Sequence, residues 1–408
     1  MEKRTSIYTT LADYLVEFGL YAVMLGLFLS NALKSIGIVT ICFSILFHKN
    51  SFRNAKKLLD NRLYLAAIVL AAIYILSVFN STDYSTYWQL TNIKWLYFFF
   101  PVAIVNYSLP KSSIRNLMIT GICCALFQSA YSLYYLFSYD AESLKNIYGT
   151  GNIINTFKIH HVQLSILYSI LILLLYTFVT KKELDRRVRI AAGFFCVLFF
   201  IIVHLYAVRS GIILTYLFLT GYTIFVFKKT SSTTGFVLSG FIALGVLLFL
   251  SLSTVQNRIG YLKYDMEQYS SKNKDAIQYS DSRRLISINT GIDIILQHKF
   301  FGCGLGDIKK ASAAVYKKNY PDLDEKYYYL PHSQYIFFGA CFGIFLGLII
   351  CLLFIYPSFY FFQEKKYGFF IISFGLMVFA LWDAWFGTLF GNCLYLLLIG
   401  FGLKNKWA

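Results

Sequence analysis

Long stretches of this chain carry no charged side chain, for example residues 116–139, 159–180 and 230–257. Each is long enough for a helix that crosses a membrane, which takes about 20 mostly apolar residues. The composition agrees, because 58% of the residues are hydrophobic and only 14% are charged, against about 25% charged residues in a typical soluble domain. The sequence therefore excludes a soluble enzyme and predicts a polytopic membrane protein.

Apolar runs of spanning length recur along the whole chain, so we expect an all-α fold of about twelve transmembrane helices. Their ends are marked by charged or polar loops. The expected spans are residues 12–30, 33–48, 63–80, 91–108, 116–138, 159–180, 190–207, 211–227, 235–253, 334–356, 368–386 and 388–403.

The basic residues are distributed unevenly between the two sides of this predicted membrane. The chain has a net charge of +17. Alternate loops on one side carry twenty Lys and Arg, whereas the short loops and adjoining helix ends on the other side carry five. Because cytoplasmic loops are enriched in Lys and Arg, both termini are predicted to be cytoplasmic. The charge thus reflects topology, and the expected surroundings are membrane lipid, with no nucleic-acid partner.

One large loop, residues 254–333, is placed on the outer face by the same count. Four apolar residues in it recur at the spacing of one helical face: Leu285, Ile288, Ile292 and Ile295. We expect a helix there that lies along the membrane or packs on the bundle, and a second short helix at about 307–318. The predicted division is helices 1–9 in 1–253, the loop domain in 254–333, and helices 10–12 in 334–408.

The eight cysteines do not indicate a redox or metal site. Seven lie inside apolar runs, where Cys behaves as a small hydrophobic residue. Only Cys303 lies in a polar segment, and the sequence has no Cys-x-x-Cys and no Cys/His ligand cluster. We therefore expect the cysteines to serve packing, and we predict no metal site and no cofactor.

Four ionisable residues are expected together at the outer face: Arg209, Arg283, Arg284 and His332. Each has an ordinary explanation on its own, namely an arginine that reaches the lipid headgroups, a solvated charged pair and a helix-capping histidine. As a group they suit a reaction whose leaving group is a phosphate or diphosphate. Guanidinium groups bind phosphate oxygens, and imidazole accepts a proton near neutral pH.

The sequence around these residues resembles the O-antigen ligase and polymerase superfamily. The run Ser-Arg-Arg-Leu at 282–285 leads to Gln-His-Lys-Phe-Phe-Gly-Cys-Gly-Leu-Gly at 297–306, similar to the family's Arg-led helix and glycine turn. Arg-Ser-Gly at 209–211 is similar to a second family element. His332 and the serine after it, followed by nine residues and Gly343, fit the ligase pattern.

This resemblance implies a metal-independent, inverting glycosyltransferase of the membrane-embedded GT-C type. It implies transfer of glycan from undecaprenyl diphosphate to a sugar hydroxyl of lipid A–core, at the periplasmic face of the bacterial inner membrane. By the same resemblance Arg209 and Arg284 would hold the diphosphate, with Arg283 as the less favoured position. His332 would activate or orient the acceptor hydroxyl.

Five further residues are candidates for substrate binding: Lys94, Asp383, His160, His161 and Ser333. Lys94 would add a positive charge for the phosphates or reach the headgroups instead. Asp383 would pair with an arginine, orient His332 or form a structural ion pair. The two adjacent histidines would line the entrance of the site, and Ser333 belongs to the ligase pattern.

Other functions remain open at this stage. Within the same superfamily they are an O-antigen polymerase, which extends the glycan on its lipid carrier, and a ligase that glycosylates protein. From another class comes a flippase or transporter of lipid-linked glycan. Transporters usually place their site at the midplane between internal repeats, whereas the candidate groups here gather at one face, which disfavours transport.

Overall fold

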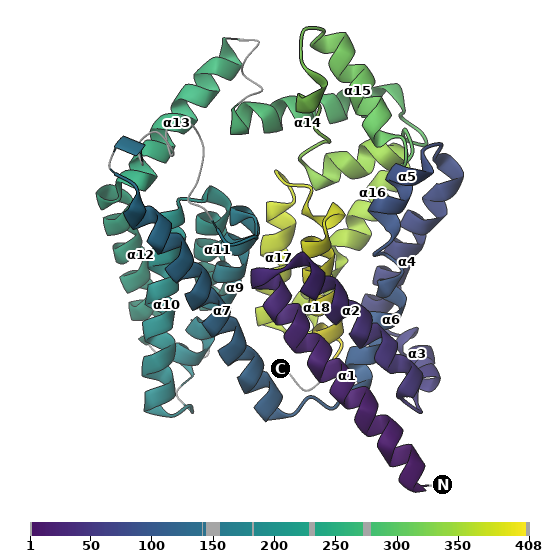
Figure 1. The fold of residues 1–408 in the computed structure, drawn as a ribbon, viewed down its shortest axis with the longest axis vertical. Helices are drawn as coiled ribbons and strands as arrows, with labels where there is room; N and C mark the ends of the chain where they lie inside the picture. Colours follow the sequence, from purple (N-terminus) through teal and green to yellow (C-terminus); the bar gives the residue numbers. More distant parts are fainter. Residues whose placement is uncertain are drawn as a thin grey trace. The chain divides into compact units, whose positions relative to one another are not determined.

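The computed structural model describes residues 2–140, 142–143, 156–181, 183–227, 233–271 and 279–404. Within these ranges the chain is all helical and contains no strand (Figure 1), as the sequence predicts. The α-helices are α1 (Glu2–Leu29), α2 (Asn31–Phe43), α3 (Ser51–Leu58), α4 (Arg62–Leu76), α5 (Tyr84–Thr91), α6 (Leu96–Asn106), α7 (Lys111–Ser138), α9 (His161–Thr180), α10 (Arg186–Tyr206), α11 (Arg209–Phe227), α12 (Thr233–Ser251), α13 (Ser253–Ser270), α14 (Ser280–Gln297), α15 (Ile308–Asn319), α16 (Gln334–Gln363), α17 (Tyr367–Phe379) and α18 (Leu389–Gly402).

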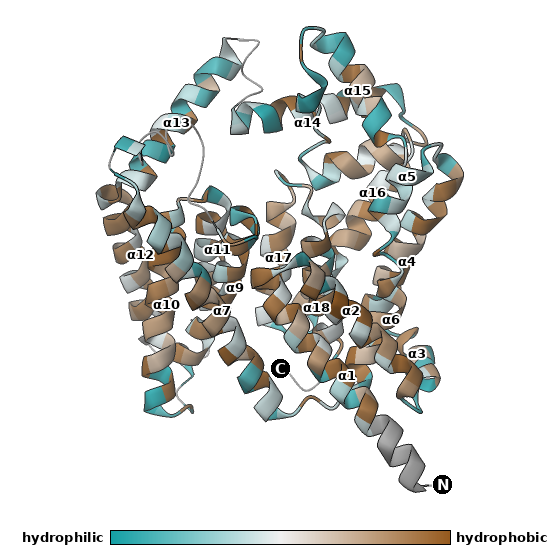
Figure 2. Cartoon of the chain, viewed as in Figure 1, coloured by the Kyte–Doolittle hydropathy of each residue, from teal (hydrophilic) through white to brown (hydrophobic). Residues whose placement is uncertain are grey.

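Several of these helices are long and apolar enough to cross a membrane. In the described ranges six qualify singly, and up to eight if each of two bent helix pairs counts as one span. Figure 2 shows hydrophobic residues filling α9–α12 and α16–α18, and hydrophilic residues gathered on α13–α15. The protein is therefore a multi-pass membrane protein. The full number of twelve spans stays a prediction, because at most eight spans in the described ranges are long and apolar enough; α17 and α18, for example, are shorter than a spanning helix.

The chain forms two compact units. The first unit comprises residues 1–26, 31–115 and 268–408, and the second comprises residues 27–30 and 116–267. The division predicted from the sequence follows the membrane topology rather than compactness, so it stays a prediction.

The second unit is held together by hydroxyl groups between apolar helices. Its helix α9 packs against α10 and α11. The Ser169 hydroxyl lies 2.9 Å from that of Thr215, and the Tyr176 hydroxyl lies 2.9 Å from that of Thr223. A side chain on Gly211 would collide with Ser165, because an added Cβ would lie 2.4 Å from the serine Cβ. Small residues thus allow α9 and α11 to approach closely enough for these bonds.

In the first unit, α16 packs against α4, α14 and α17. Helix α14 runs across the end of the longer helices of this unit, with α15 beside it (Figure 1). The sequence predicts both helices correctly, since α14 and α15 lie where helices are expected.

The buried face of α14 differs from the expected one. The residues it buries are Ser282, Ile286, Ser287, Thr290, Gly291 and Ile294, whereas Ile292 of the predicted apolar face is 39% exposed. The reason is close packing on the start of α16. An added Cβ at Gly291 would lie 2.5 Å from Ile336 and 2.8 Å from Pro331, so small side chains must face α16.

A turn after α14 is built into a break in α16. Gly343 has a φ of +78° and interrupts the helical backbone. The turn replaces the hydrogen bonds that the break removes: Cys303 N–H donates to the Ala340 carbonyl at 2.9 Å, and Ile344 N–H donates to the Lys299 carbonyl at 2.8 Å. An added Cβ at Gly343 would lie 2.3 Å from the Phe300 carbonyl oxygen, so only glycine fits without strain.

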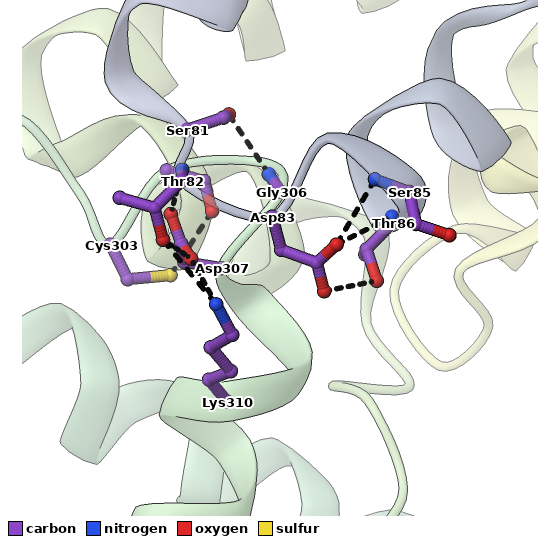
Figure 3. A network of polar contacts seen from close by, with 10 residues as sticks. Ser81, Thr82, Asp83, Ser85, Thr86, Cys303, Gly306, Asp307 and Lys310 are labelled. Atoms are coloured by element: carbon purple, nitrogen blue, oxygen red, sulfur yellow. Dashed lines mark hydrogen bonds and ion pairs between the residues drawn. The ribbon is translucent and has the colours of Figure 1, made fainter.

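A polar network fixes the other side of this turn to the α4–α5 connection (Figure 3). The Asp307 carboxylate accepts hydrogen bonds from the backbone N–H of Thr82 at 2.6 Å and from the Lys310 ammonium at 3.4 Å. Gly306 N–H donates to the Ser81 hydroxyl at 3.0 Å. The turn after α14 is thus bonded to α16 on one side and to the α4–α5 connection on the other.

Candidate functional site

The first unit brings together four of the residues singled out in the sequence. Arg283 and Arg284 lie in the first turn of α14, and His332 lies two residues before α16. Both guanidinium groups act electrostatically on His332, and Arg284 also acts on Asp383, in the connection between α17 and α18. We call these four residues the arginine–histidine cluster. The close packing of α14 on the start of α16 is what assembles it.

His332 is held by a buried serine. The Ser287 hydroxyl lies 2.8 Å from Nδ1 of His332 and also accepts the backbone N–H of His332 at 3.3 Å. Ser287 has no exposed surface. The imidazole is therefore fixed at both its ring and its backbone.

The same surroundings keep His332 neutral. Burial lowers its pKa, the charges of Arg284 and Arg283 add to this decrease, and the Leu330 carbonyl opposes it, so that the pKa is about 4. The ring is thus a free base at neutral pH, which is the state that accepts a proton.

The pKa of Asp383 is shifted in the opposite direction, above its ordinary value. Burial raises its pKa and the charge of Arg284 offsets part of this increase, so that the pKa is about 6. The connection that carries Asp383 is tied to the start of α16 by Gln334: its backbone N–H donates to the Ala380 carbonyl at 2.9 Å, and its side-chain oxygen accepts the Phe386 N–H at 3.0 Å.

An aromatic ring lies close to both an arginine and the histidine. The Arg283 guanidinium carbon lies 4.9 Å from the centre of the Tyr329 ring, and that ring lies 5.9 Å from the imidazole of His332. Tyr329 thus contacts a charged group and the candidate base.

Arg209 belongs to the second unit, where it lines an apolar groove between α10, α11, α12 and α13. The groove has a volume of about 360 Å³. A second guanidinium, Arg258, also lines it; this residue is 8% exposed and lies 5.0 Å from the Tyr261 ring. Much of the remaining lining is hydrophobic and exposed, as at Ile213, Val246, Phe249 and Leu250. The groove therefore combines an apolar wall with two fixed positive charges.

The remaining candidates make other contacts. Lys94 is fully buried, where its ammonium donates to the Phe386 carbonyl at 3.1 Å and to the Asn392 side chain at 2.5 Å. Ser333 is buried at the start of α16 and its side chain does not cap the helix. In the second unit His160 caps α9 by accepting the Val162 N–H at 3.4 Å.

His161 stacks beside His160, with the ring centres 4.2 Å apart. Within the described ranges, no three His, Cys, Asp or Glu side chains gather as a metal site would require.

Sequence reasoning missed Ser287, Gln334 and Arg258. Ser287 carried a signal, because it lies three residues after Arg284 and thus on the same face of one helix. The others carried none, since their roles depend on contacts between distant segments.

The fold and the cluster describe a multi-pass helical membrane protein in which two arginines, a histidine and an aspartate interact. The model of a family described as O-antigen ligase matches residues 194–352. This stretch carries the domain of the O-antigen ligase superfamily, which confirms the resemblance seen in the motifs. The matched range includes Arg209, Arg284 and His332 and supports activity of the O-antigen ligase or polymerase type. No curated protein matches the chain.

Proposed function

We propose that this protein is an O-antigen ligase that transfers glycan from undecaprenyl diphosphate to a sugar hydroxyl of lipid A–core. The observation that carries the proposal is the neutral imidazole of His332 beside two guanidinium groups, with its pKa lowered to about 4 by burial and by those charges. A base that stays unprotonated next to cations suits a reaction in which a hydroxyl loses a proton while an anionic group leaves.

In this mechanism the acceptor hydroxyl attacks the anomeric carbon of the donor from the side opposite the diphosphate. The new C–O bond forms as the bond to the diphosphate breaks, and the configuration inverts. His332 takes the hydroxyl proton, while Arg284 binds the diphosphate, which leaves with the bonding electron pair. Arginine charges take the role that a metal ion has in other transferases.

The groove of the second unit supports a lipid-linked donor. An isoprenoid diphosphate has an apolar chain and an anionic head. The groove complements both, because its walls are apolar and Arg209 and Arg258 are positively charged. The charge distribution of the sequence supports cytoplasmic termini and a periplasmic loop in a bacterial inner membrane. The proposed fold type is GT-C.

Reconstituted transfer tests the proposal. Purified protein is given undecaprenyl-diphosphate glycan, with or without lipid A–core and with or without a chelator, and the products are separated on a gel. We expect a product that requires lipid A–core and is insensitive to the chelator. Longer lipid-linked glycan without that acceptor would assign a polymerase, product on a protein acceptor would assign a protein ligase, and no transfer at all would favour a transporter.

A further inference from the structure

The hydroxyl of Ser287 has three hydrogen-bond partners, and they differ in whether they can donate or accept a hydrogen bond. It lies 2.8 Å from the Arg284 carbonyl oxygen, 3.3 Å from the backbone nitrogen of His332, and 2.8 Å from Nδ1 of the His332 ring. The carbonyl can only accept, and the backbone N–H can only donate.

A hydroxyl has one proton and two lone pairs. Because the Arg284 carbonyl takes the proton, both lone pairs of Ser287 are left to accept. The backbone N–H of His332 fills one of them. The other accepts from the ring only if Nδ1 carries a proton, so all three bonds are satisfied together by a single arrangement.

We propose that Ser287 is a positioning residue that holds neutral His332 with its proton on Nδ1, so that Nε2 is the atom that takes the proton of the acceptor hydroxyl. This inference rests on the proposed transfer reaction for the role of Nε2. The tautomer itself is a property of the resting protein. When Nε2 is protonated in the reaction, the Nδ1–H bond to Ser287 is kept, so the imidazole does not need to turn.

The charged groups around the ring act on its second protonation rather than on the tautomer. Arg283 and Arg284 face it from α14 and disfavour the imidazolium. The Leu330 carbonyl is different, because it accepts a hydrogen bond from the ring and so favours a protonated nitrogen. Asp383, in the α17–α18 connection, interacts with Arg284. Ser287 is the hydroxyl in direct contact with Nδ1, and for that reason its substitution should change which nitrogen is protonated.

Nitrogen NMR of full-length protein with labelled histidine tests the tautomer directly. The chain has six histidines, and subtraction of a His332→Gln spectrum identifies the signals of His332. At neutral pH we expect a protonated Nδ1 and an unprotonated Nε2 in the wild type. Ser287→Ala should shift population to the Nε2-protonated form, and Ser287→Thr, which keeps the hydroxyl, should restore the wild-type pattern.

Thr290→Val is the matched control. Thr290 is also buried on α14, and its hydroxyl bonds back to the Ile286 carbonyl at 3.0 Å. This variant should leave the His332 signals unchanged. A wild-type spectrum with the proton on Nε2, or a Ser287→Ala spectrum equal to the wild type, would overturn the inference.

Transfer rates separate this inference from the proposed function. We expect Ser287→Ala to lower kcat about tenfold or more, with little change in the KM for donor, and Ser287→Thr to recover most of it. A tautomer that depends on Ser287 in a protein without transferase activity would uphold the positioning role and reject the function. Full activity of Ser287→Ala despite a changed tautomer would reject Nε2 as the proton acceptor.

Discussion

At the scale of single residues, the charge on His332 is set by burial and by its two arginine neighbours. Its pKa of about 4 lies below the ordinary value of 6.5, so the ring is neutral at neutral pH and in mild acid. A base with so low a pKa keeps its function in mild acid and loses it only as the pH falls through that value.

The pH profile of transfer follows from these charges. We expect kcat to decline on the acid side with an inflection near the His332 pKa of about 4. In Arg283→Gln the loss of one neighbouring positive charge raises the pKa of His332, so this limb moves toward neutral pH. The measurement is kcat at saturating substrate in a pH series. An acid limb at the same pH in wild type and variant would contradict the electrostatic coupling.

Asp383 predicts a pH-dependent stability. Its folded-state pKa of about 6 lies above the ordinary 3.8, so the ionised carboxylate destabilises the folded state increasingly as the pH rises from about 4 to 6, and fully above that range. Asp383→Asn removes this titration. We expect a higher unfolding temperature than wild type at about pH 7.5 and little difference at about pH 4, measured with a thiol-reactive dye. A gain of equal size at both pH values would speak against the shifted carboxyl.

At the scale of elements, the sequence predicts that α14 and α15 are helices but not the orientation of α14. Helical periodicity is a local signal, and the two helices lie where they are expected. Which face of α14 is buried depends on the approach of Pro331 and Ile336 at Gly291. These segments are about 40 residues apart in the chain, and the apolar periodicity of one helix carries no information on such a contact. The same close packing brings Ser287 against His332.

The break in α16 predicts a position that tolerates only glycine. In Gly343→Ala the new Cβ would collide with the Phe300 carbonyl oxygen, and φ would stay at +78°. We expect destabilisation of about 1–3 kcal/mol and reduced transfer, because the turn after α14 would be displaced. Gly368→Ala in α17, where nothing lies within 4 Å of the added Cβ, is the control. Equal unfolding temperatures for the two variants would contradict this role of the break.

The groove of the second unit predicts a role for Arg258 in donor binding. If its guanidinium contacts the anionic head of the lipid donor, Arg258→Ala should raise the KM for donor about 10-fold or more, since a charged hydrogen bond contributes about 1.5–3 kcal/mol. The KM for acceptor should not change. Steady-state kinetics with each substrate varied in turn measures both constants, and an unchanged KM for donor would exclude the contact.

At the scale of the whole molecule, the class of protein is predictable from uncharged stretches and the loop charges, because both depend only on residue type. The number of transmembrane spans is harder to predict from the sequence. Helices such as α17 and α18 are too short by themselves to cross, and their place in a membrane depends on the helices around them. The sequence indicated all four residues of the arginine–histidine cluster, whereas it did not indicate that Lys94 is buried and bonded to Phe386 and Asn392, because those contacts join segments far apart in the chain.

The measurement that tests the central claim most directly is transfer to lipid A–core by purified wild type, His332→Gln and His48→Gln. His48 follows the first short helix, Ser44–Phe47, and its Nδ1 accepts the Asn50 N–H at 3.3 Å. We predict that His332→Gln lowers kcat about 100- to 10,000-fold at an unchanged unfolding temperature, while His48→Gln retains wild-type activity. Wild-type transfer by folded His332→Gln would contradict the assignment of His332 as the base.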